Sequence, residues 1–403
     1  MTLSAVDLRP QSRTIDVSPL SIVLLTFVAG VFVIGSLVSV TQALLFLTGG
    51  LLGLTLYHAS FGFTGGWKRF ATEGRSRSMR VQFLMIGLTA LVFIPLMSGL
   101  NPFGETFVGA WAPVGVSVIL GAFIFGLGMQ LGGGCGSGTL FTVGGGSSRM
   151  LVTLTGFIIG AAVGTAHLPY WLSLPSLPTI KLGETFGAVN GTLITLAALA
   201  VVIGVLAFLE RRKHGNVESM FDGLADFSPA KLVHGPWPLI IAALVLAFGN
   251  ILTLFLAGHP WSVTYGFGLW GAKIFNAIGI RVGEWPFWKA PAQARALNQS
   301  ALNDVTSVMN FGVILGAALA ASLAGRFAVK SKVPFASWLA AILGGLLMGY
   351  GARLSFGCNI GALFSGIASG SLHGWVWFVM AFLGSLLGIG LRPLFGLDGF
   401  RKK

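Results

Sequence analysis

The chain has 403 residues, of which 54% are hydrophobic and only 9% are charged, and its mean hydropathy is +0.85. Soluble domains carry about 25% charged residues, so this composition excludes a soluble domain with a core of ordinary size. The net charge of +13 fits Lys and Arg gathered in the cytoplasmic loops of a membrane protein, rather than a nucleic-acid-binding surface. The two cysteines are too few to define a disulfide framework.

Apolar segments recur along the whole chain, and most are long enough to cross about 30 Å of hydrocarbon. The first 19 residues lack the pattern of a cleaved signal peptide. The chain is therefore predicted to be an all-α, polytopic membrane bundle. The apolar segments lie near residues 20–40, 41–65, 81–99, 113–131, 150–168, 187–209, 238–258, 259–280, 303–324, 334–356 and 374–394.

Four stretches are predicted to be re-entrant rather than spanning: 41–65, 132–148, 259–280 and 357–371. All four are rich in Gly, Ser and Thr. Glycine inside a helix costs about 1 kcal/mol relative to alanine. Irregular backbone is tolerated at membrane depth only where it is buried in protein or lines a cavity. About nine transmembrane helices and four re-entrant segments are expected on this basis.

The positions of the basic residues select an orientation for this arrangement. If every re-entrant segment returns to the side it entered from, the N-terminus lies outside and the C-terminus inside. All the basic blocks then face the cytoplasm, as the positive-inside rule requires, whereas segment 281–300 lies outside. The blocks are residues 68–80, 149, 211–213 with 231, 326–332 and 401–403.

An internal repeat supports two related halves. GLGMQLGGGCGSGTLF (126–141) aligns without gaps to GYGARLSFGCNIGALF (349–364), with eight identities in sixteen positions that include both cysteines. Residues 1–186 would form the first repeat, 187–237 a linking helix with a cytoplasmic loop, and 238–403 a second, inverted repeat. Inverted repeats whose broken helices meet at the midplane are typical of secondary transporters.

Cys135 and Cys358 are the strongest candidates for a site. A lone membrane cysteine is usually a small apolar residue, but these two are equivalent in the repeat and lie in glycine-flanked loops. The helices expected after them would point their N-termini into the membrane, where free amides favour an anion. A thiol adds a weak, polarizable donor suited to sulfur. Redox chemistry is the rival use, and it depends on a distance that the sequence does not fix.

Other polar residues could line the same path. Arg353 lies within a predicted span with Gln130 as its repeat partner, and charged residues at this depth are usually functional. The alternative for Arg353 and for Lys273 is a structural or interfacial role. The histidines show no metal spacing, and no phosphate-binding loop occurs, so no metal, cofactor or built-in ATPase is expected. The predicted pathway residues are Cys135, Cys358, Gly134, Gly136, Ser137, Gly138, Gly357, Asn359, Gly361, Arg353, Gln130 and Lys273, and Thr139 and Ser365 could donate hydrogen bonds in the same loops.

The paired GxGxxLxxGCxxGxLF motifs resemble the YeeE/YedE family of bacterial sulfur-transport membrane proteins over nearly the whole chain. The resemblance implies nine spans with re-entrant loops, and cysteines that line a central path for thiosulfate. Members that carry thiosulfate typically have a further cysteine in the first re-entrant loop, where this chain reads HASFGFTGG (58–66). Some members are associated with selenium metabolism.

The predicted function is a permease or channel, not an enzyme, for a small sulfur-containing anion such as thiosulfate. An intramembrane thiol protein that relays sulfur or selenium remains the alternative. The expected partners are the anion, membrane lipid and a separate cytoplasmic sulfur-carrier protein, without nucleic acid.

Overall fold

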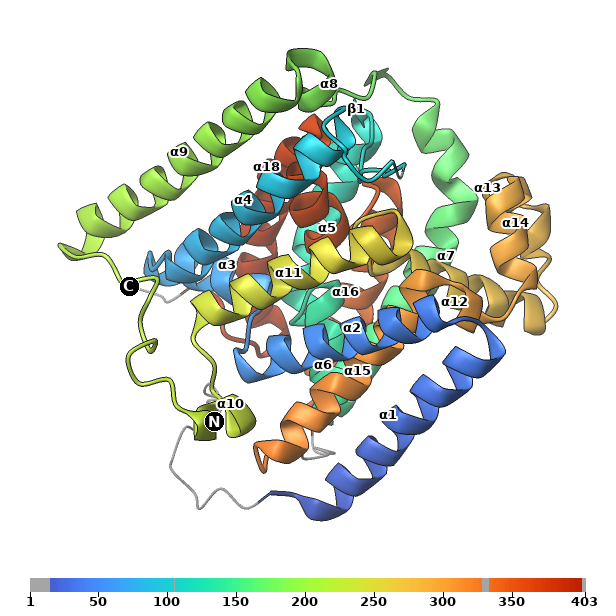
Figure 1. The fold of residues 1–403 in the computed structure, drawn as a ribbon, viewed down its shortest axis with the longest axis horizontal. Coiled ribbons are helices and arrows are strands. Elements are labelled where there is room, and N and C mark those ends of the chain that lie inside the picture. The colour runs from blue at the N-terminus through green and yellow to red at the C-terminus, as the bar shows by residue number, and fades with distance from the viewer. Residues whose placement is uncertain (1–14, 105, 328–332, 401–403) are drawn as a thin grey trace.

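The computed structural model describes residues 15–104, 106–327 and 333–400. Within them the chain is almost entirely helical, which confirms the predicted all-α fold class. Two strands of two residues, β1 (Val114–Gly115) and β2 (Ser176–Leu177), form a small antiparallel ladder at one end (Figure 1). Two of the basic blocks used for the orientation lie wholly or partly outside the described residues. They are residues 401–403 and, within the 326–332 loop, residues 328–332.

Among the described residues, ten helical segments are long and apolar enough to cross a membrane, one more than predicted. Two of the ten candidates contain breaks and are made of two shorter helices each. They are α1 (Val17–Leu37), α2 (Val40–His58) with α3 (Phe63–Glu73), α4 (Arg77–Met97), α5 (Val116–Gly132) with α6 (Gly136–Gly144), α7 (Ser148–Leu172), α9 (Ala188–His214), α11 (Leu239–Ala257), α15 (Val305–Leu323), α16 (Phe335–Leu354) and α18 (Leu372–Leu391).

The extra candidate consists of α2 and α3 and includes the segment 41–65, which was predicted to be re-entrant. α2 runs antiparallel to α1, as two contacts show. Phe46 of α2 packs on Gly30 of α1, and Phe27 of α1 packs on Gly50 of α2. Its 19 residues cover about 28 Å, close to the thickness of the hydrocarbon core. α2 is therefore long and apolar enough to cross a membrane, and the chain turns back into the bundle in the short helix α3.

The contacts of Asp16 favour a different orientation of α1 from the one predicted. The Asp16 amide, just before α1, donates to the Ser322 carbonyl, and the Phe327 amide donates to the Asp16 carboxylate. The start of α1 thus lies at the same end of the molecule as Phe327. If α2 is a span, a ten-span arrangement obeys the positive-inside rule when both ends of the described chain face the cytoplasm, and this orientation is a prediction.

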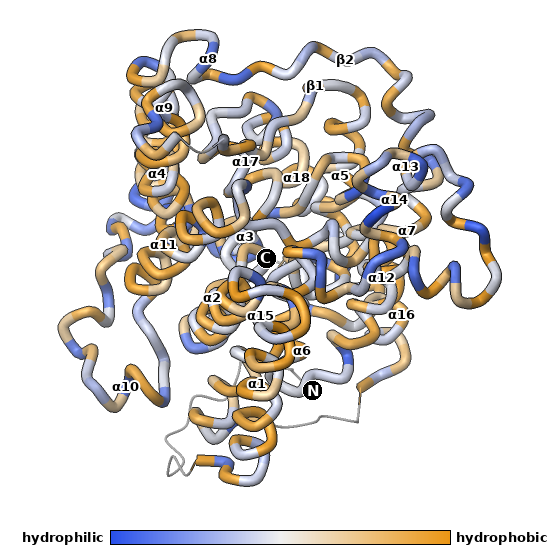
Figure 2. The backbone as a smooth tube through the Cα atoms, turned by 45° about the vertical axis from the view of Figure 1, so that its right-hand side comes forward, coloured by the Kyte–Doolittle hydropathy of each residue, from blue (hydrophilic) through white to orange (hydrophobic). Residues whose placement is uncertain are grey.

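Charged residues gather at this end. Arg75 and Arg80 bind the buried carboxylate of Glu210, and Arg69 binds Glu218, so that α3, α4 and the end of α9 are tied together. The opposite end carries β1, β2 and the short helices α8 (Leu182–Phe186), α13 (Pro286–Lys289) and α14 (Pro291–Asn298) (Figures 1 and 2).

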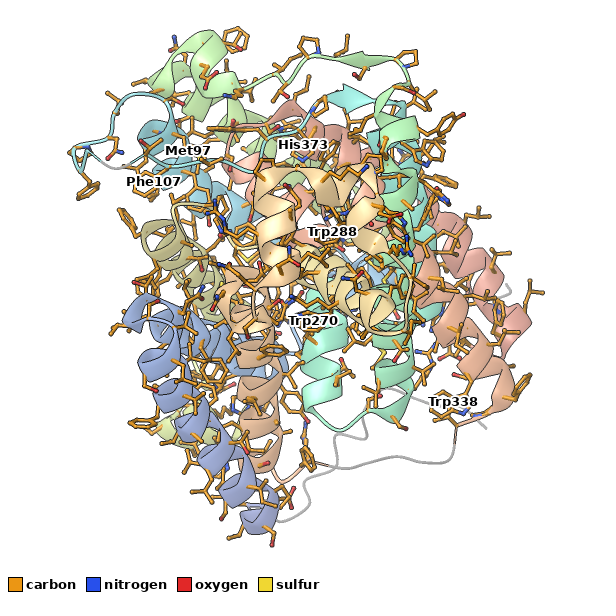
Figure 3. The ribbon with its side chains drawn as sticks, turned by 90° about the vertical axis from the view of Figure 1, so that its right-hand side faces the viewer. Met97, Phe107, Trp270, Trp288, Trp338 and His373 are labelled. Carbon is orange, nitrogen blue, oxygen red and sulfur yellow. The ribbon has the colours of Figure 1, made fainter. Side chains whose placement is uncertain are left out.

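Segment 281–300 packs onto the bundle at that opposite end. The Trp288 indole of α13 is buried and donates to the Thr165 hydroxyl of α7 at 2.9 Å (Figure 3). α12 (Thr264–Ala277) lies beside it and also packs against α7. The helix α10 (Pro229–His234) lies at the basic end, where His234 contacts the Leu323 carbonyl.

Four breaks interrupt the helices at the centre of the fold. They lie between α2 and α3, between α5 and α6, between α11 and α12, and between α16 and the π-helical turn η3 (Asn359–Ser365) that leads into α17 (Gly366–Ala368). Each break contains a residue with positive φ: Ser60 (48°), Gly133 (89°), Gly258 (74°) and Phe356 (60°). Such a residue ends an α-helix because the chain leaves the right-handed helical region there.

Glycines bring the central helices into backbone contact. A Cβ on Gly126 would lie 1.9 Å from the Ala381 carbonyl oxygen of α18, and one on Gly349 would lie 2.1 Å from the Phe157 carbonyl oxygen of α7. Close helix approach through small residues is the usual way in which helices associate in lipid. α5 and α16 consequently pack against one another, with α18 against α5 and α7 against α16.

Candidate functional site

The two Gly-Cys loops meet in the core of the bundle. Cys135 and Cys358 are free thiols, exposed by only 1% and 0%. A Cβ on Gly136 would lie 3.1 Å from the Cys358 sulfur, so the loop that carries one thiol touches the other. The tertiary structure thus brings together two residues that are far apart in the sequence, one from each predicted repeat.

Cys135 begins α6 and interacts with backbone donors. Its sulfur accepts from the Gly138 amide at 3.4 Å and lies 3.5 Å from the Ser137 hydroxyl. The amide of Phe63, at the start of α3, faces the same sulfur. Two helix N-termini therefore point at this thiol, and their amides and dipoles favour a negatively charged group.

Cys358 lies in the corresponding place in the second loop. The amides of Ile360 and Gly361 face its sulfur, and Gly361 also lies near the Ser262 hydroxyl. Gly357 has φ 153°, and a Cβ there would lie 2.7 Å from the Ala362 amide nitrogen. Only glycine therefore allows this loop to turn so tightly before the cysteine.

The break between α11 and α12 lies beside the two Gly-Cys loops. The Val263 side chain lies 3.4 Å from the Cβ position of Gly136, and the Asn310 amide donates to the Val263 carbonyl. The Trp261 amide donates to Asn250, and the Ser365 hydroxyl donates to the Trp261 carbonyl at 2.9 Å. These bonds fix the α12 N-terminus beside the two thiols.

Several buried polar side chains near these loops have no hydrogen-bond partner among the described residues. Asn359 is fully buried, and neither its amide nitrogen nor its amide oxygen is bonded. The Thr139 hydroxyl of α6 and the Trp261 indole nitrogen are likewise unpaired. Leaving such a group unpaired in a packed core costs about 1–3 kcal/mol.

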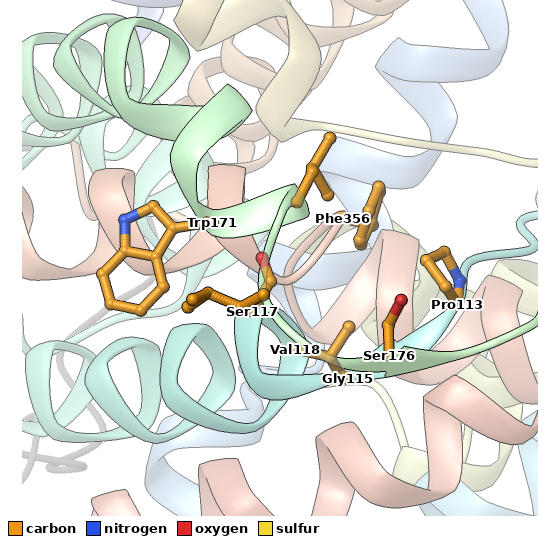
Figure 4. Close-up of a pocket in the computed structure, with 9 residues that line it drawn as sticks. Pro113, Gly115, Ser117, Val118, Trp171, Ser176 and Phe356 are labelled. Atoms are coloured by element: carbon orange, nitrogen blue, oxygen red, sulfur yellow. The ribbon is translucent and has the colours of Figure 1, made fainter.

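A cavity of about 210 Å³ lies at the end opposite the basic residues, directly above the Cys358 loop. Phe356, two residues before Cys358, lines it together with Ser117, Trp171 and Ser176 (Figure 4). In the repeat, Phe356 corresponds to Gly133, which lies two residues before Cys135. Both residues have positive φ and both are exposed, so each cysteine loop has one accessible position beside it.

A second pocket of about 290 Å³ lies at the same end, over α14 and the start of α15. His259, Tyr265, Arg295 and Asp304 line it. Burial raises the pKa of the Asp304 carboxyl above its usual value, although its two bonds from Ser307 act in the opposite direction. Among the described residues, no group of three or more His, Cys, Asp or Glu could hold a metal ion.

Two predicted pathway residues, Arg353 and Lys273, make their contacts away from the two Gly-Cys loops. The Arg353 guanidinium lies 4.9 Å from the Phe287 ring and 5.9 Å from the Tyr265 ring, on the face of α16 that packs against α7. Lys273 donates to the carbonyls of Leu297 and Gln299 and so secures the segment after α14. A pathway role for either remains a prediction, and these contacts are structural.

The remaining predicted residues surround the loops. Gln130 is fully buried and donates to the Thr64 carbonyl at 3.3 Å and to Ser385 at 2.7 Å. Gly134 packs against Met150 and the Thr139 amide. The sequence analysis missed Phe63, Trp261 and Phe356, although Phe356 could have been found from its aligned position in the repeat.

Comparisons with known proteins identify the family. The family model described as "Sulphur transport" matches residues 58–387. The thiosulfate transporter TsuA of Spirochaeta thermophila is 26% identical over 84% of this chain and 95% of its own length. TsuA of Escherichia coli is 24% identical over 83% of this chain and 90% of its own length.

A probable transporter, YedE of Escherichia coli, is more similar over a shorter region. It is 33% identical over 165 residues, which is 40% of this chain and 39% of that protein. These relatives are bacterial transporters, which agrees with a multi-pass protein of the inner membrane. The chain therefore belongs to the sulphur-transport family of membrane proteins.

Proposed function

We propose that this protein transports a small sulfur-containing anion, with thiosulfate as the first candidate, between its two Gly-Cys loops. The observation that carries the proposal is the contact of the Cys358 sulfur with Gly136. This contact joins the two loops at the centre of the bundle. One loop lies below the cavity at Phe356, and the other lies beside the exposed Gly133 near the basic end.

The physical case rests on replacing the water around the anion. Removing an anion from water is costly unless the path supplies hydrogen-bond donors. Here the N-termini of α3, α6 and α12 converge, and the unpaired donors of Asn359, Thr139 and Trp261 lie near the loops. The two thiols add weak, polarizable contacts that a sulfur solute can leave again, as conduction requires.

The inverted repeat remains part of this proposal, and reciprocal contacts support it. Gly128 packs against the carbonyl of Gly344, and Gly351 packs against the carbonyl of Gly121. In the alignment that pairs the cysteines, Gly121 corresponds to Gly344 and Gly128 to Gly351. The two contacts are thus the same interaction seen from each half, as a twofold relation between the halves requires. α1 and α9 would lie outside the repeat.

Uptake of labelled thiosulfate tests the proposal directly. Cells that lack their other thiosulfate importers should accumulate label only when they express this protein. Cys135→Ala and Cys358→Ala should each reduce uptake at least tenfold while the protein still inserts and accumulates. Wild-type uptake by the double variant would remove the thiols from the mechanism, and no uptake by the wild type would exclude thiosulfate.

One observation favours the alternative of a thiol protein that relays sulfur or selenium. The two free cysteines lie in touching loops, as paired redox thiols would. Mass measurement of Cys135 and Cys358 during uptake separates the two functions. A disulfide or persulfide that forms in step with turnover would support the relay, whereas unchanged thiols would support passage without reaction.

A further inference from the structure

The cavity of about 210 Å³ at the end opposite the basic residues has no charged side chain among the described residues that line it. Its polar side chains are those of Ser117, Trp171 and Ser176. Ser117 donates to the Leu354 carbonyl at 2.6 Å, and the Trp171 indole donates to the Tyr350 hydroxyl at 2.8 Å. Two of the three donors are thus already used within the protein, so the cavity offers few side-chain donors to replace the water of an entering anion.

Phe356 separates this cavity from the Cys358 thiol. Its ring is 38% exposed and lines the cavity, whereas the cysteine two residues later is 0% exposed (Figure 4). The carbonyl oxygen of Phe356 lies 4.0 Å from the Cβ position of Gly361, whose amide faces the Cys358 sulfur. A solute that enters the cavity therefore meets the Phe356 ring before it meets the thiol.

The residues on either side of Phe356 are held in place. The Ser355 hydroxyl accepts from the Trp377 indole at 3.0 Å, and the Gly357 amide donates to the Ala352 carbonyl at 2.9 Å. An exposed side chain changes rotamer rapidly, without help from the backbone. The Phe356 ring can consequently turn while the backbone around the thiol stays fixed.

The equivalent place in the first repeat has no ring. Gly133 corresponds to Phe356 in the alignment of the cysteine loops, and a Cβ there would lie 2.7 Å from a guanidinium nitrogen of Arg149. One cysteine loop thus has an apolar ring beside it, whereas the other has a glycine next to a cation. The ring is therefore a property of one end of the molecule, and the backbone that the two loops share does not require it.

We infer that the Phe356 ring is the gate of the path at the end opposite the basic residues and determines which anions pass. The ring keeps hydrated solutes from Cys358 and turns aside for an anion that has lost part of its water. An anion with part of its charge on sulfur holds water less strongly than one with all its charge on oxygen. Thiosulfate therefore passes an apolar constriction more readily than sulfate does. The inference rests on the proposed function, because it names what distinguishes solutes on the same path.

Chemical modification of Cys358 in the purified protein tests the gate without transport. Cys135→Ser leaves Cys358 as the one thiol of the chain, and the probe is the anionic reagent sulfonatoethyl methanethiosulfonate, followed by mass measurement. In this background, Phe356→Ala should make modification about tenfold faster, because access controls the reactivity of a buried thiol. Phe356→Leu, which keeps an apolar side chain, should stay close to the parent rate. Phe248→Ala, which removes an exposed ring of α11 that does not line the cavity, should do the same.

A second variant keeps the test decisive if Phe356→Ala does not accumulate. Phe356→Gly also removes the ring, and glycine adopts the observed φ of 60° without strain. Modification in the ring-free variants that is as slow as in the parent would overturn the gate and leave the proposed function intact.

Initial uptake rates of labelled thiosulfate and labelled sulfate, at equal concentrations, test the selection. With both native cysteines present, Phe356→Ala should lower the thiosulfate-to-sulfate ratio about tenfold, within the range that one group of an apolar pocket provides. Phe248→Ala should leave the ratio unchanged. An unchanged ratio in Phe356→Ala would overturn selection by hydration. A wild type that takes up neither anion would overturn the proposed function together with the selection, and the modification rates would still decide the gate.

Discussion

At the scale of single residues, Asn359 is the most informative side chain of the site. It is fully buried directly after Cys358, and both polar atoms of its amide lack partners among the described residues. Asn250 offers a matched contrast, because it is equally buried but bonds to Trp261 and Ser365. One asparagine is therefore structural, and the geometry leaves the other available to a solute.

Asn359→Leu should preserve or raise stability while it lowers uptake. It keeps a similar volume and removes an unpaired polar group that costs about 1–3 kcal/mol. Asn250→Leu should instead destabilise the protein by about 1–3 kcal/mol, since it leaves the Trp261 amide and the Ser365 hydroxyl without this partner. Thermal unfolding in detergent and thiosulfate uptake measure the two effects. An Asn359→Leu variant with full uptake would contradict a solute-facing amide.

Phe356 combines a strained backbone with an exposed ring in the cavity above Cys358. Its φ of 60° costs a non-glycine residue about 1–3 kcal/mol, and its repeat partner Gly133 adopts a similar φ without this cost. Phe356→Gly and Phe356→Ala both remove the ring, but only glycine relieves the strain. Phe356→Gly should therefore be more stable than Phe356→Ala by about 1 kcal/mol in the free energy of unfolding. Thermal unfolding in detergent measures this as a higher unfolding temperature for Phe356→Gly. Equal stabilities would mean that the strain is relaxed in solution.

At the scale of elements, residues with positive φ determine where the central helices end, and glycines determine how closely these helices pack. Each of the four central breaks contains a residue with positive φ, which turns the chain and directs the next helix N-terminus inward. The glycines within α5 and α16 let carbonyl oxygens of α18 and α7 approach the helix backbone. Positive-φ residues thus direct the helix N-termini inward, and glycines allow the close packing of the core.

Gly126→Ala and Gly349→Ala should destabilise the protein to a similar extent, because both residues face a carbonyl oxygen at about 2 Å from the added Cβ. The expected loss is about 1–3 kcal/mol each, as for other cases of overpacking. Gly204→Ala is the control, since no atom lies within 4 Å of its Cβ position in α9. It should be neutral or raise stability by up to about 1 kcal/mol. Unfolding temperatures measure all three, and a harmless Gly126→Ala would contradict this packing.

At the scale of the whole molecule, peripheral helices surround a compact broken-helix core. The most apolar windows of α1 and α9 are buried over only 11% and 22% of their length, whereas that of α15 is buried over 72%. Their exposed apolar faces fit contact with lipid. The core that holds the cysteines is therefore enclosed by peripheral helices, with a cavity at the end opposite the basic residues.

Cysteine accessibility can decide the orientation of the whole molecule. Ser36→Cys at the end of α1 and Ser173→Cys after α7 should label from the periplasm in intact cells, and Ser219→Cys after α9 should not. All three serines are exposed, and the two native cysteines are buried and should remain silent. Labelling of Ser36→Cys only from the cytoplasm would restore the nine-span arrangement with an external N-terminus.

Much of the fold was determined by the sequence alone, for a physical reason. A segment in hydrocarbon must satisfy its own backbone hydrogen bonds, so apolar composition and length are enough to specify helices. The all-α membrane bundle and the family resemblance are confirmed on this basis. Glycine-rich composition also located the broken helices, because glycine is where the chain can leave the helical region.

Other features depended on contacts between distant residues, which composition does not encode. α2 is glycine-rich and was expected to turn back, yet its glycines pack against α15, for example Gly49 against Met309, within one helix that is long enough to span. The contacts of Arg353 and Lys273 could not be predicted for the same reason. Their partners Phe287 and Leu297 lie in segment 281–300, which contains no predicted membrane span. The contact between the two cysteine loops was also decided only by the tertiary structure. Charge and hydropathy act locally along the chain, whereas the position of a side chain relative to a path depends on how the helices pack.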